Sequence, residues 1–187
     1  MPYLKRSEIE DLGFAKVGEN VLISRKASLY NCKEISIGSN VRIDDFCVLS
    51  AGAGGILIGS YVHVAVYSLI IGASKITLSD FCNLSSRTSI YSSSDDYSGA
   101  TMTNPMIPAQ FKNVDHADVY LGRHVIVGCG SIILPGSILG DGVAVGALSL
   151  INSNCKEFGI YAGIPARFVK SRMQNLIALE SRFKASL

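Results

Sequence analysis

Aliphatic side chains recur at every sixth position along much of the chain. In steps of six from one starting point, every position is aliphatic: Leu121, Val127, Ile133, Leu139, Val145 and Ile151. An α-helix repeats about every 3.6 residues and a coiled coil about every seven, so no helix keeps these side chains on one face. The period favours short strands joined by sharp turns, with one aliphatic side chain of each strand in the core.

Earlier parts of the chain keep the same step, with short slips between the runs. The runs are Val17, Ile23, Leu29, Ile35; then Ile37, Ile43, Leu49; then Ile58, Val64, Ile70, Ile76; then Leu78, Leu84, Ile90. Hexapeptide repeats are typical of β-helices, in which each repeat forms one side of a coil. We therefore expect an all-β solenoid of about six coils, which at ~4.8 Å per strand spacing is a prism ~25–30 Å long.

One long segment interrupts the repeat. Residues 91–118 lack the six-residue step and carry the polar run SSSDDYSG around Asp95 and Asp96. A long excursion from a regular solenoid is usually functional or disordered. The interruption is therefore a candidate site.

Both ends of the solenoid need a cover, because their strand edges are unpaired. Ser7 and Glu10 have the spacing of a helical capping box, which predicts a short N-terminal helix. Residues 167–183 predict an amphipathic helix at the other end. The sequence thus divides into a cap at 1–16, a β-helix at 17–156 with its loop at 91–118, and a C-terminal segment with a helix at 157–187.

Composition excludes several classes of protein. A net charge of +2 gives no electrostatic footprint for nucleic acid. No apolar run reaches the length of a signal-peptide core at the start or of a membrane span elsewhere. Five scattered cysteines without a CxxC pair favour reduced, mostly structural thiols in a cytoplasmic protein.

Two quoted segments carry a more specific resemblance. The stretch LGRHVIVGCGSIILPGSILGDGVAVGALSLIN (121–152), followed by YAGIPARFVK (161–170), resembles the closing coils of the galactoside, xenobiotic and maltose acetyltransferases. These belong to the left-handed parallel β-helix acyltransferases. The resemblance implies an acetyl-CoA-dependent acetyltransferase acting on a hydroxyl or amine of a sugar or sugar nucleotide, in surface-polysaccharide (O-antigen or capsule) synthesis. It also implies a homotrimer with active sites between subunits.

The resemblance also suggests where acetyl-CoA binds. Small side chains let a pantetheine arm approach the backbone of the last coils, and the candidates are Gly128, Cys129, Gly146 and Ala147. By the family's pattern, Arg167 and Lys170 would contact the phosphates. The alternatives are close packing of coils for the small residues and ordinary solvated charge for the cations.

The resemblance does not identify the catalytic base, because the family's loop histidine is missing from YSSSDDYSG (91–99). Asp95 and Asp96 are candidates, since adjacent carboxylates raise one another's pKa when desolvated. Tyr97 would then help to shape the acceptor pocket. The same Asp and Ser residues also make good turns. A neutral amine is already nucleophilic, so N-acetylation would need a base less than O-acetylation does.

Aligning the coils by their anchors yields a second candidate group. Arg42, His63 and Asn83 each precede an anchor and should form an outward column. His63 is a candidate catalytic group or a trimer contact, and Arg42 and Asn83 are candidate substrate ligands. His116 lies in the excursion and could reach a neighbouring site, and His124 is interpreted as structural.

Two other functions share this kind of prism. The γ-class carbonic anhydrases bind zinc through three histidines, but the spacing of His63, His116 and His124 does not match their pattern, so we expect no metal. A trimeric scaffold without catalysis is the other alternative.

Overall fold

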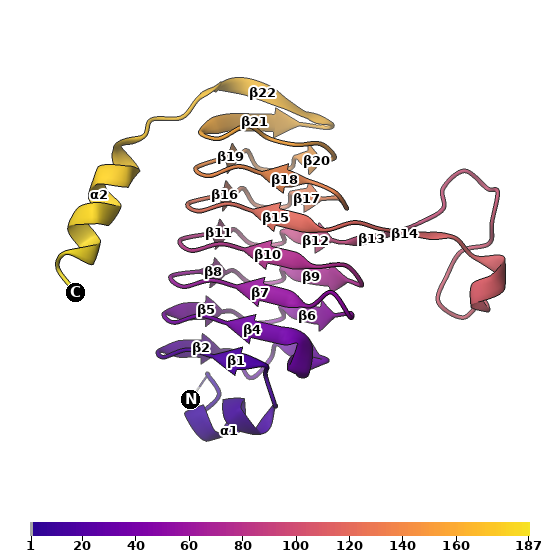
Figure 1. Cartoon of the computed structure of the whole chain (residues 1–187), viewed down its shortest axis with the longest axis horizontal. Coiled ribbons are helices and arrows are strands. Elements are labelled where there is room, and N and C mark those ends of the chain that lie inside the picture. Colours follow the sequence, from indigo (N-terminus) through magenta and orange to yellow (C-terminus); the bar gives the residue numbers. More distant parts are fainter. Residues whose placement is uncertain (1) are drawn as a thin grey trace.

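The chain folds into the expected parallel β-helix. The computed structural model describes residues 2–187 and shows a prism of three parallel sheets (Figure 1). Six complete coils contribute one strand to each sheet, and a partial seventh coil follows. The prediction of about six coils is confirmed.

Each sheet collects one strand from every coil. The first sheet contains β1 (Lys16–Val17), β4 (Ile35–Ile37), β7 (Ile56–Ile58), β10 (Ile76–Leu78), β15 (Val119–Leu121) and β18 (Ile138–Leu139). The second contains β2 (Val21–Ile23), β5 (Val41–Ile43), β8 (His63–Val64), β11 (Asn83–Leu84), β16 (Ile126–Val127), β19 (Ala144–Val145), β21 (Gly159–Gly163) and the antiparallel β22 (Ala166–Ser171). The third contains β3 (Ser28–Tyr30), β6 (Val48–Ala51), β9 (Leu69–Gly72), β12 (Ser89–Tyr91), β17 (Ile132–Ile133) and β20 (Leu150–Ile151).

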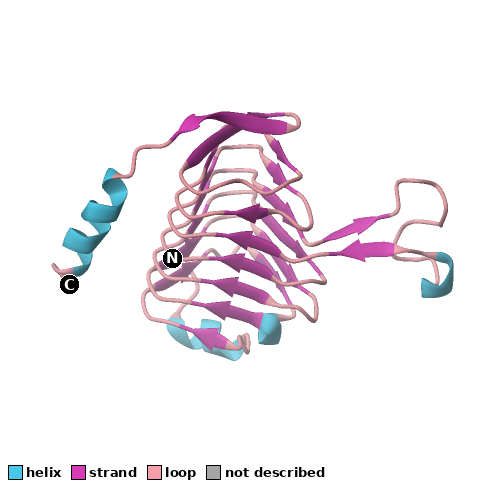
Figure 2. Cartoon of the chain, turned by 45° about the horizontal axis from the view of Figure 1, so that its top comes forward, coloured by secondary structure: helices cyan, strands magenta, loops and turns pink. Residues whose placement is uncertain are grey.

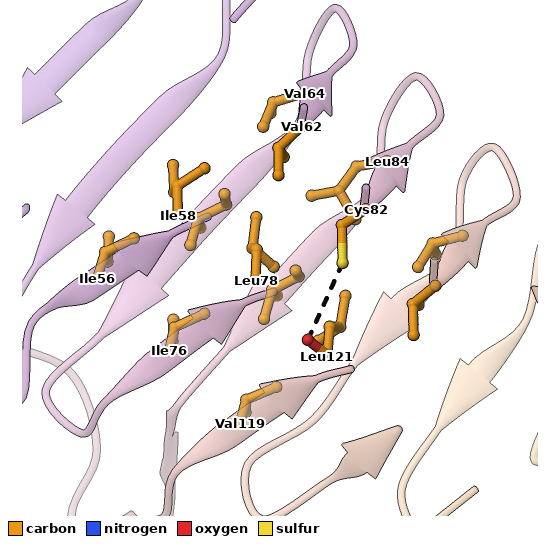
Figure 3. Packing of buried hydrophobic residues seen from close by; sticks show 14 of the residues in the cluster. Ile56, Ile58, Val62, Val64, Ile76, Leu78, Cys82, Leu84, Val119 and Leu121 are labelled. Atoms are coloured by element: carbon orange, nitrogen blue, oxygen red, sulfur yellow. Dashed lines mark hydrogen bonds between the residues drawn. The ribbon is translucent and has the colours of Figure 1, made fainter. Parts of the chain in front are cut away.

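The core is a stack of aliphatic side chains, one above another. Ile58, Leu78 and Leu121 lie in register on three successive strands and are at most 1% exposed (Figure 3). Because side chains alternate along a strand, the residues next to each anchor point outward. Each coil therefore has only a few side chains that point into the prism. Filling those positions with apolar groups is what the six-residue period encodes.

Four of the five cysteines belong to this core, as expected for structural thiols. Cys32, Cys47, Cys82 and Cys155 are buried, and only Cys129 is exposed. Burial raises the pKa of Cys82 to about 12 and that of Cys155 to about 11. These two thiols are therefore unreactive near neutral pH.

The interruption of the repeat forms a hairpin that projects sideways from the fourth coil. Strands β13 (Ser93–Asp95) and β14 (Val114–His116) pair antiparallel and lead into a loop that contains the 3-10 turn η2 (Ala109–Phe111). Figures 1 and 2 show the hairpin standing well clear of the prism. The solenoid resumes in register, since β15 pairs directly with β10.

The structure differs from the sequence prediction at both ends. Helix α1 (Arg6–Asp11) begins before Ser7, and the free N–H of Lys5 donates to Glu8 rather than to Glu10 (2.7 Å). At the other end, 166–171 is strand β22, and helix α2 is confined to Asn175–Lys184. The apolar spacing of 166–171 is compatible with a helix or with an edge strand. The segment forms a strand because it pairs with β21. Within 2–187 the remaining helical segments are the 3-10 turns η1 (Cys32–Glu34) and η2. No helix in this part of the chain is long and apolar enough to cross a membrane.

Helix α2 folds back against one corner of the prism. At that corner Tyr61, Phe81 and His124 form a stacked column, and the ring of Phe183 packs edge-on against Tyr61 and Phe81. His124 thus has the structural environment that the sequence predicts for it.

A buried carboxylate fixes the helix at the same corner. Glu180 is 8% exposed and accepts hydrogen bonds from Arg123, His124 and Lys184. Burial alone would raise the pKa of Glu180, but these partners outweigh it and lower the pKa to about 2. The ionised carboxylate therefore stabilises the docked helix.

We predict that Glu180→Gln loosens α2 while leaving the prism folded. Loss of the charged hydrogen bonds should cost roughly 1.5–3 kcal/mol of docking, so amide exchange in 175–184 should accelerate about tenfold or more. In the unmodified chain the folded pKa lies below the ordinary value. The stabilisation is therefore complete above about pH 4.5 and is lost as the pH falls toward 2.

Hydrogen-exchange mass spectrometry of the α2 peptide measures the exchange rate of these amides. Glu19→Gln, at an exposed carboxylate, is the control. Equal exchange in the two variants would contradict the role of Glu180.

Candidate functional site

The outer surface of the second sheet carries two columns of side chains. Residues directly before the anchors stack as Arg42, His63, Asn83, Ile126, Ala144 and Ile160. Residues directly after the anchors stack beside them as Asp44, Ala65, Ser85, Gly128, Gly146 and Ala162, and each of the first five donates a backbone hydrogen bond to the coil above. The predicted register of Arg42, His63 and Asn83 is confirmed, and we call these two columns together the second-sheet wall.

The lower part of the wall is polar and internally hydrogen-bonded. Arg42 Nε donates to Asp44 Oδ1 (2.6 Å), and Asp44 Oδ2 lies 2.8 Å from His63 Nε2. The other ring nitrogen, Nδ1, lies 3.1 Å from Asn83 Oδ1. Both of these oxygens accept hydrogen bonds, so His63 donates from both ring nitrogens in this arrangement, and neither is free to take a proton from a substrate.

Two shallow cavities flank this polar cluster. One of about 310 Å³ is lined by Pro2, Tyr3, Arg42, Asp44, Asp45 and Val66. The other, also of about 310 Å³, is lined by Asn40, Arg42, Tyr61, Val62 and His63. Arg42 borders both cavities, so its guanidinium can reach a ligand in either.

The upper part of the wall is apolar, and its second column (Gly128, Gly146 and Ala162) is a strip of small residues. A Cβ on Gly128 would lie 2.4 Å from the backbone nitrogen of Ala147, so coil packing alone requires glycine there. At Gly146 the nearest atom would be the Ala162 Cβ at 3.0 Å. The exposed Cys129 follows Gly128 at the corner beside this strip, where its carbonyl accepts from Leu148. The resulting flat strip leaves backbone groups accessible from outside.

Two cations stand at the top of the wall. In the β21–β22 pair, Arg167 lies opposite Ala162 and Lys170 lies opposite Ile160, so each continues one of the two columns. Both side chains are exposed, and Arg167 Nη1 donates only to the carbonyl of Ala166 (3.0 Å) among the described residues. The wall therefore runs from a polar cluster, through a small apolar strip, to a pair of cations.

The two hairpin carboxylates have different surroundings. Asp96 accepts hydrogen bonds from the backbone of Ser98 (2.8 Å) and Thr101 (2.9 Å) and from the Thr101 hydroxyl (2.8 Å). These bonds, led by those from Ser98, lower the pKa of Asp96 to about 2. Asp95 is exposed, and its carboxylate makes no hydrogen bond within 2–187, while the neighbouring Tyr97 is 93% exposed. Asp96 closes the loop, and Asp95 is free to meet a ligand.

Within one chain the two predicted groups are apart. Figure 1 shows the hairpin on the side of the prism opposite the turns that lead into the second sheet. Asp95 therefore does not share a site with His63 or Gly128 of its own chain. A site that uses both needs the hairpin of another subunit.

The three histidines lie in three different places. His63 is on the wall, His124 is under α2, and His116 is on the hairpin, where Nδ1 lies 2.9 Å from Ser93 Oγ. In 2–187, no three His, Cys, Asp or Glu side chains gather as a metal-binding group. The arrangement gives no support to a zinc site within one chain.

Two wall residues escaped the sequence analysis. Asp44 fixes His63, and Ser85 lies between Ala65 and Gly128, where its hydroxyl makes no hydrogen bond within 2–187. The predicted column contains only the residue before each anchor. In a strand the residue after the anchor points outward as well, so the same register argument would have found both.

Comparisons with known proteins agree with this geometry. The chain is 54% identical over 186 residues to the dTDP-4-amino-4,6-dideoxy-D-glucose acyltransferase of Escherichia coli, covering 100% of this chain and 97% of the relative. It is 28% identical to the putative lipopolysaccharide biosynthesis O-acetyl transferase WbbJ of Escherichia coli K12, over 84% of this chain and 88% of the relative. No protein-family model matches the chain.

Solved structures give the same picture. A mutant form of AntD, an N-acyltransferase from Bacillus cereus in complex with dTDP-4-amino-4,6-dideoxyglucose and coenzyme A, is 45% identical with a TM-score of 0.96, covering 100% of this chain and 98% of that one. A maltose O-acetyltransferase from Clostridium difficile 630 is 22% identical with a TM-score of 0.61, over 90% of this chain and 75% of that one, and shares the fold.

We predict that Asp96→Ala opens the hairpin loop without unfolding the prism. The three hydrogen bonds that close the loop are lost, while the hairpin makes few contacts with the coils, so cleavage after the exposed Tyr97 should become several-fold faster. Limited chymotrypsin digestion followed by mass spectrometry measures the rate. Asp115→Ala, at an exposed carboxylate on the facing strand, should digest like the unmodified chain.

Proposed function

We propose, since the chain belongs to the hexapeptide-repeat acyltransferases that act on sugars, that it transfers an acyl group from acyl-CoA to the amino group of a nucleotide-linked amino sugar. The observation that carries this is the second-sheet wall, with its polar cluster, small strip and cations in one line. Acetyl is the acyl group that the Ala-Gly-Ile-Pro-Ala-Arg ending favours. A panel of acyl-CoAs tested with amino-sugar nucleotides examines the proposal directly.

The wall suits an extended CoA. Arg167 and Lys170 would hold the phosphates, and the strip above Asn83 would accept the pantetheine arm, whose amides bind to backbone groups. From β11 to β22 there are four strand spacings, ~19 Å, which an extended pantetheine and diphosphate can span. The thioester then lies at the upper edge of the polar cluster.

The acceptor would enter from the polar end. A nucleotide-linked sugar carries a diphosphate, and Arg42 at the junction of the two cavities is a suitable partner for it. An amino sugar is protonated in water, and only its neutral amine attacks a thioester. A carboxylate near the amine can take that proton, and of the adjacent pair Asp95 and Asp96 it is Asp95 whose carboxylate makes no hydrogen bond within 2–187.

Supply of Asp95 by a neighbour requires an oligomer, and a homotrimer fits. The third sheet presents an outward column of Ser28, Val48, Leu69, Ser89, Ile132 and Leu150, which is mostly apolar. The hairpin leaves the prism directly from this sheet, after β12. Association through this surface would cover apolar groups and bring the hairpin to the wall of the next subunit.

Solved forms of AntD add one further indication. They include substitutions of one aspartate and one serine that are ten residues apart. In this chain Ser85 and Asp95 have that spacing, as do Ser86 and Asp96. Ser85 lies on the wall and Asp95 is unpartnered, so the first pair fits the proposed site.

The same proposal includes the biological setting. Acyl-CoA and nucleotide sugars are cytoplasmic compounds, so we place the reaction in the cytoplasm. The similarity to WbbJ supports a role in surface-polysaccharide synthesis.

We predict that Asp95→Asn lowers kcat on the order of 10²-fold, because the amide cannot accept the proton of the acceptor amine. The affinity for CoA should be unchanged, since the hairpin is not part of the wall. Release of free CoA thiol measures turnover, and calorimetry measures CoA binding. Asp115→Asn is the matched control, and unchanged turnover in Asp95→Asn would remove Asp95 from the proposed site.

A mixing experiment tests the shared site. Ala144→Trp should block the wall, and Asp95→Asn should disable the hairpin, so each homotrimer is inactive. In co-expressed mixed trimers roughly a quarter of the interfaces would combine an intact wall with an intact neighbouring hairpin. Recovered activity supports a site between subunits, whereas no recovery in verified mixed trimers contradicts it.

We also predict that Arg167→Gln and Lys170→Gln each weaken CoA binding about tenfold, with kcat at saturation nearly unchanged. Each change removes a hydrogen bond from a cation to a phosphate, and 1.4 kcal/mol corresponds to about tenfold. Calorimetry with CoA measures the affinity. Lys16→Gln and Lys33→Gln, at cations away from the wall, are the controls.

A further inference from the structure

Four polar side chains on the wall form one hydrogen-bonded chain. Arg42 bonds to Asp44, Asp44 to His63, and His63 to Asn83. Asp44 has only 15% of its side chain exposed, so this carboxylate is held firmly between two partners. The hydrogen-bonded series ends at Asn83, and the next three members of its column, Ile126, Ala144 and Ile160, are apolar.

The last residue of this hydrogen-bonded series, Asn83, has a hydrogen-bond donor that is not used. Asn83 Oδ1 faces His63 Nδ1 at 3.1 Å, and an amide is planar, so the NH₂ group faces away from the ring. No residue in 2–187 accepts a hydrogen bond from this NH₂ group. The coil directly above places Ile126 in the same column, and its side chain offers no acceptor. The structure thus orients a donor and leaves it unused.

The location of this donor is chemically specific. If CoA lies along the strip as proposed above, Asn83 is the first polar side chain of its own column below the pantetheine arm. The thioester carbonyl is then the nearest acceptor. This step rests on the proposed function.

We propose that Asn83 is a catalytic residue whose NH₂ group stabilises the oxyanion of the tetrahedral intermediate, with Asp44 and His63 as positioning residues. The amine lone pair forms the C–N bond while the carbonyl π electrons move to oxygen, which accepts the hydrogen bond from Asn83. Collapse restores C=O and breaks C–S, and the proton lost by nitrogen ends on the leaving sulfur. A donor fixed in advance needs no reorganisation as charge develops on oxygen.

Asn83→Asp tests the catalytic role with the least change in shape. The variant keeps an oxygen toward His63 and loses the donor, so kcat should fall 10²–10³-fold. KM for the acceptor and the affinity for CoA should change less than about threefold. Asn83→Ala should behave similarly, and Asn152→Asp, at an exposed asparagine after β20, is the control.

Asp44→Asn tests the positioning role. It should lower kcat in the unmodified background and have little further effect in the Asn83→Asp background, because both changes act on one donor. The ¹⁵N shifts of His63 should change in Asp44→Asn, and Asp44→Glu should restore part of the activity. Additive losses in the double variant would overturn the positioning role.

The outcomes separate this inference from the proposed function. If the unmodified protein does not bind CoA or release it with an amino-sugar nucleotide, the proposed function fails. If it does both and Asn83→Asp retains kcat, the role of Asn83 alone is overturned. Circular dichroism and the trimer mass of each variant exclude a folding defect as the cause of a loss.

Discussion

The backbone hydrogen bonds between successive coils determine everything else in this molecule. The strands of the six complete coils have two to four residues each. Such a strand is too short to be stable alone, and it exists because neighbouring coils pair with it in register. That register determines where each residue lies on the outer surface of its sheet. Residues about twenty apart in the sequence, such as His63 and Asn83, become neighbours one strand spacing apart. A site built in this way is rigid, because moving one residue would require sliding a whole coil.

The same constraint explains what could be predicted from the sequence. The anchors and their register followed from the period, because each inward position has room for one aliphatic side chain. The column of Arg42, His63 and Asn83 followed as well. Two of its three hydrogen bonds did not follow, because they depend on Asp44, which comes one position after the anchor Ile43. The limits of the helices were also missed, since β22 and α2 have similar apolar spacing and differ in whether β21 offers an edge.

The six-residue period does not extend into the loops, so the loop residues were the hardest to predict from the sequence. Asp95 and Asp96 are adjacent and chemically identical, and a pattern cannot separate them. The structure does so through Thr101, which lies five residues beyond Asp96 and donates two hydrogen bonds to it. A loop that fixes the Asp96 carboxylate by hydrogen bonds can also direct the side chain of the preceding Asp95 away from the loop. The division of roles between the two acids is therefore a result of local folding rather than of composition.

The two halves of the proposed chemistry have opposite structural requirements. Stabilising an oxyanion calls for a donor that does not move, and the wall supplies one through a chain of hydrogen bonds that begins at Arg42. Taking a proton from an incoming amine calls for a group that stands clear of its own coils, and the projecting hairpin supplies Asp95. One chain cannot bring both together, because the hairpin leaves the prism away from the wall. Assembly would therefore complete the site: the rigid part belongs to one subunit, and the part that meets the acceptor belongs to its neighbour.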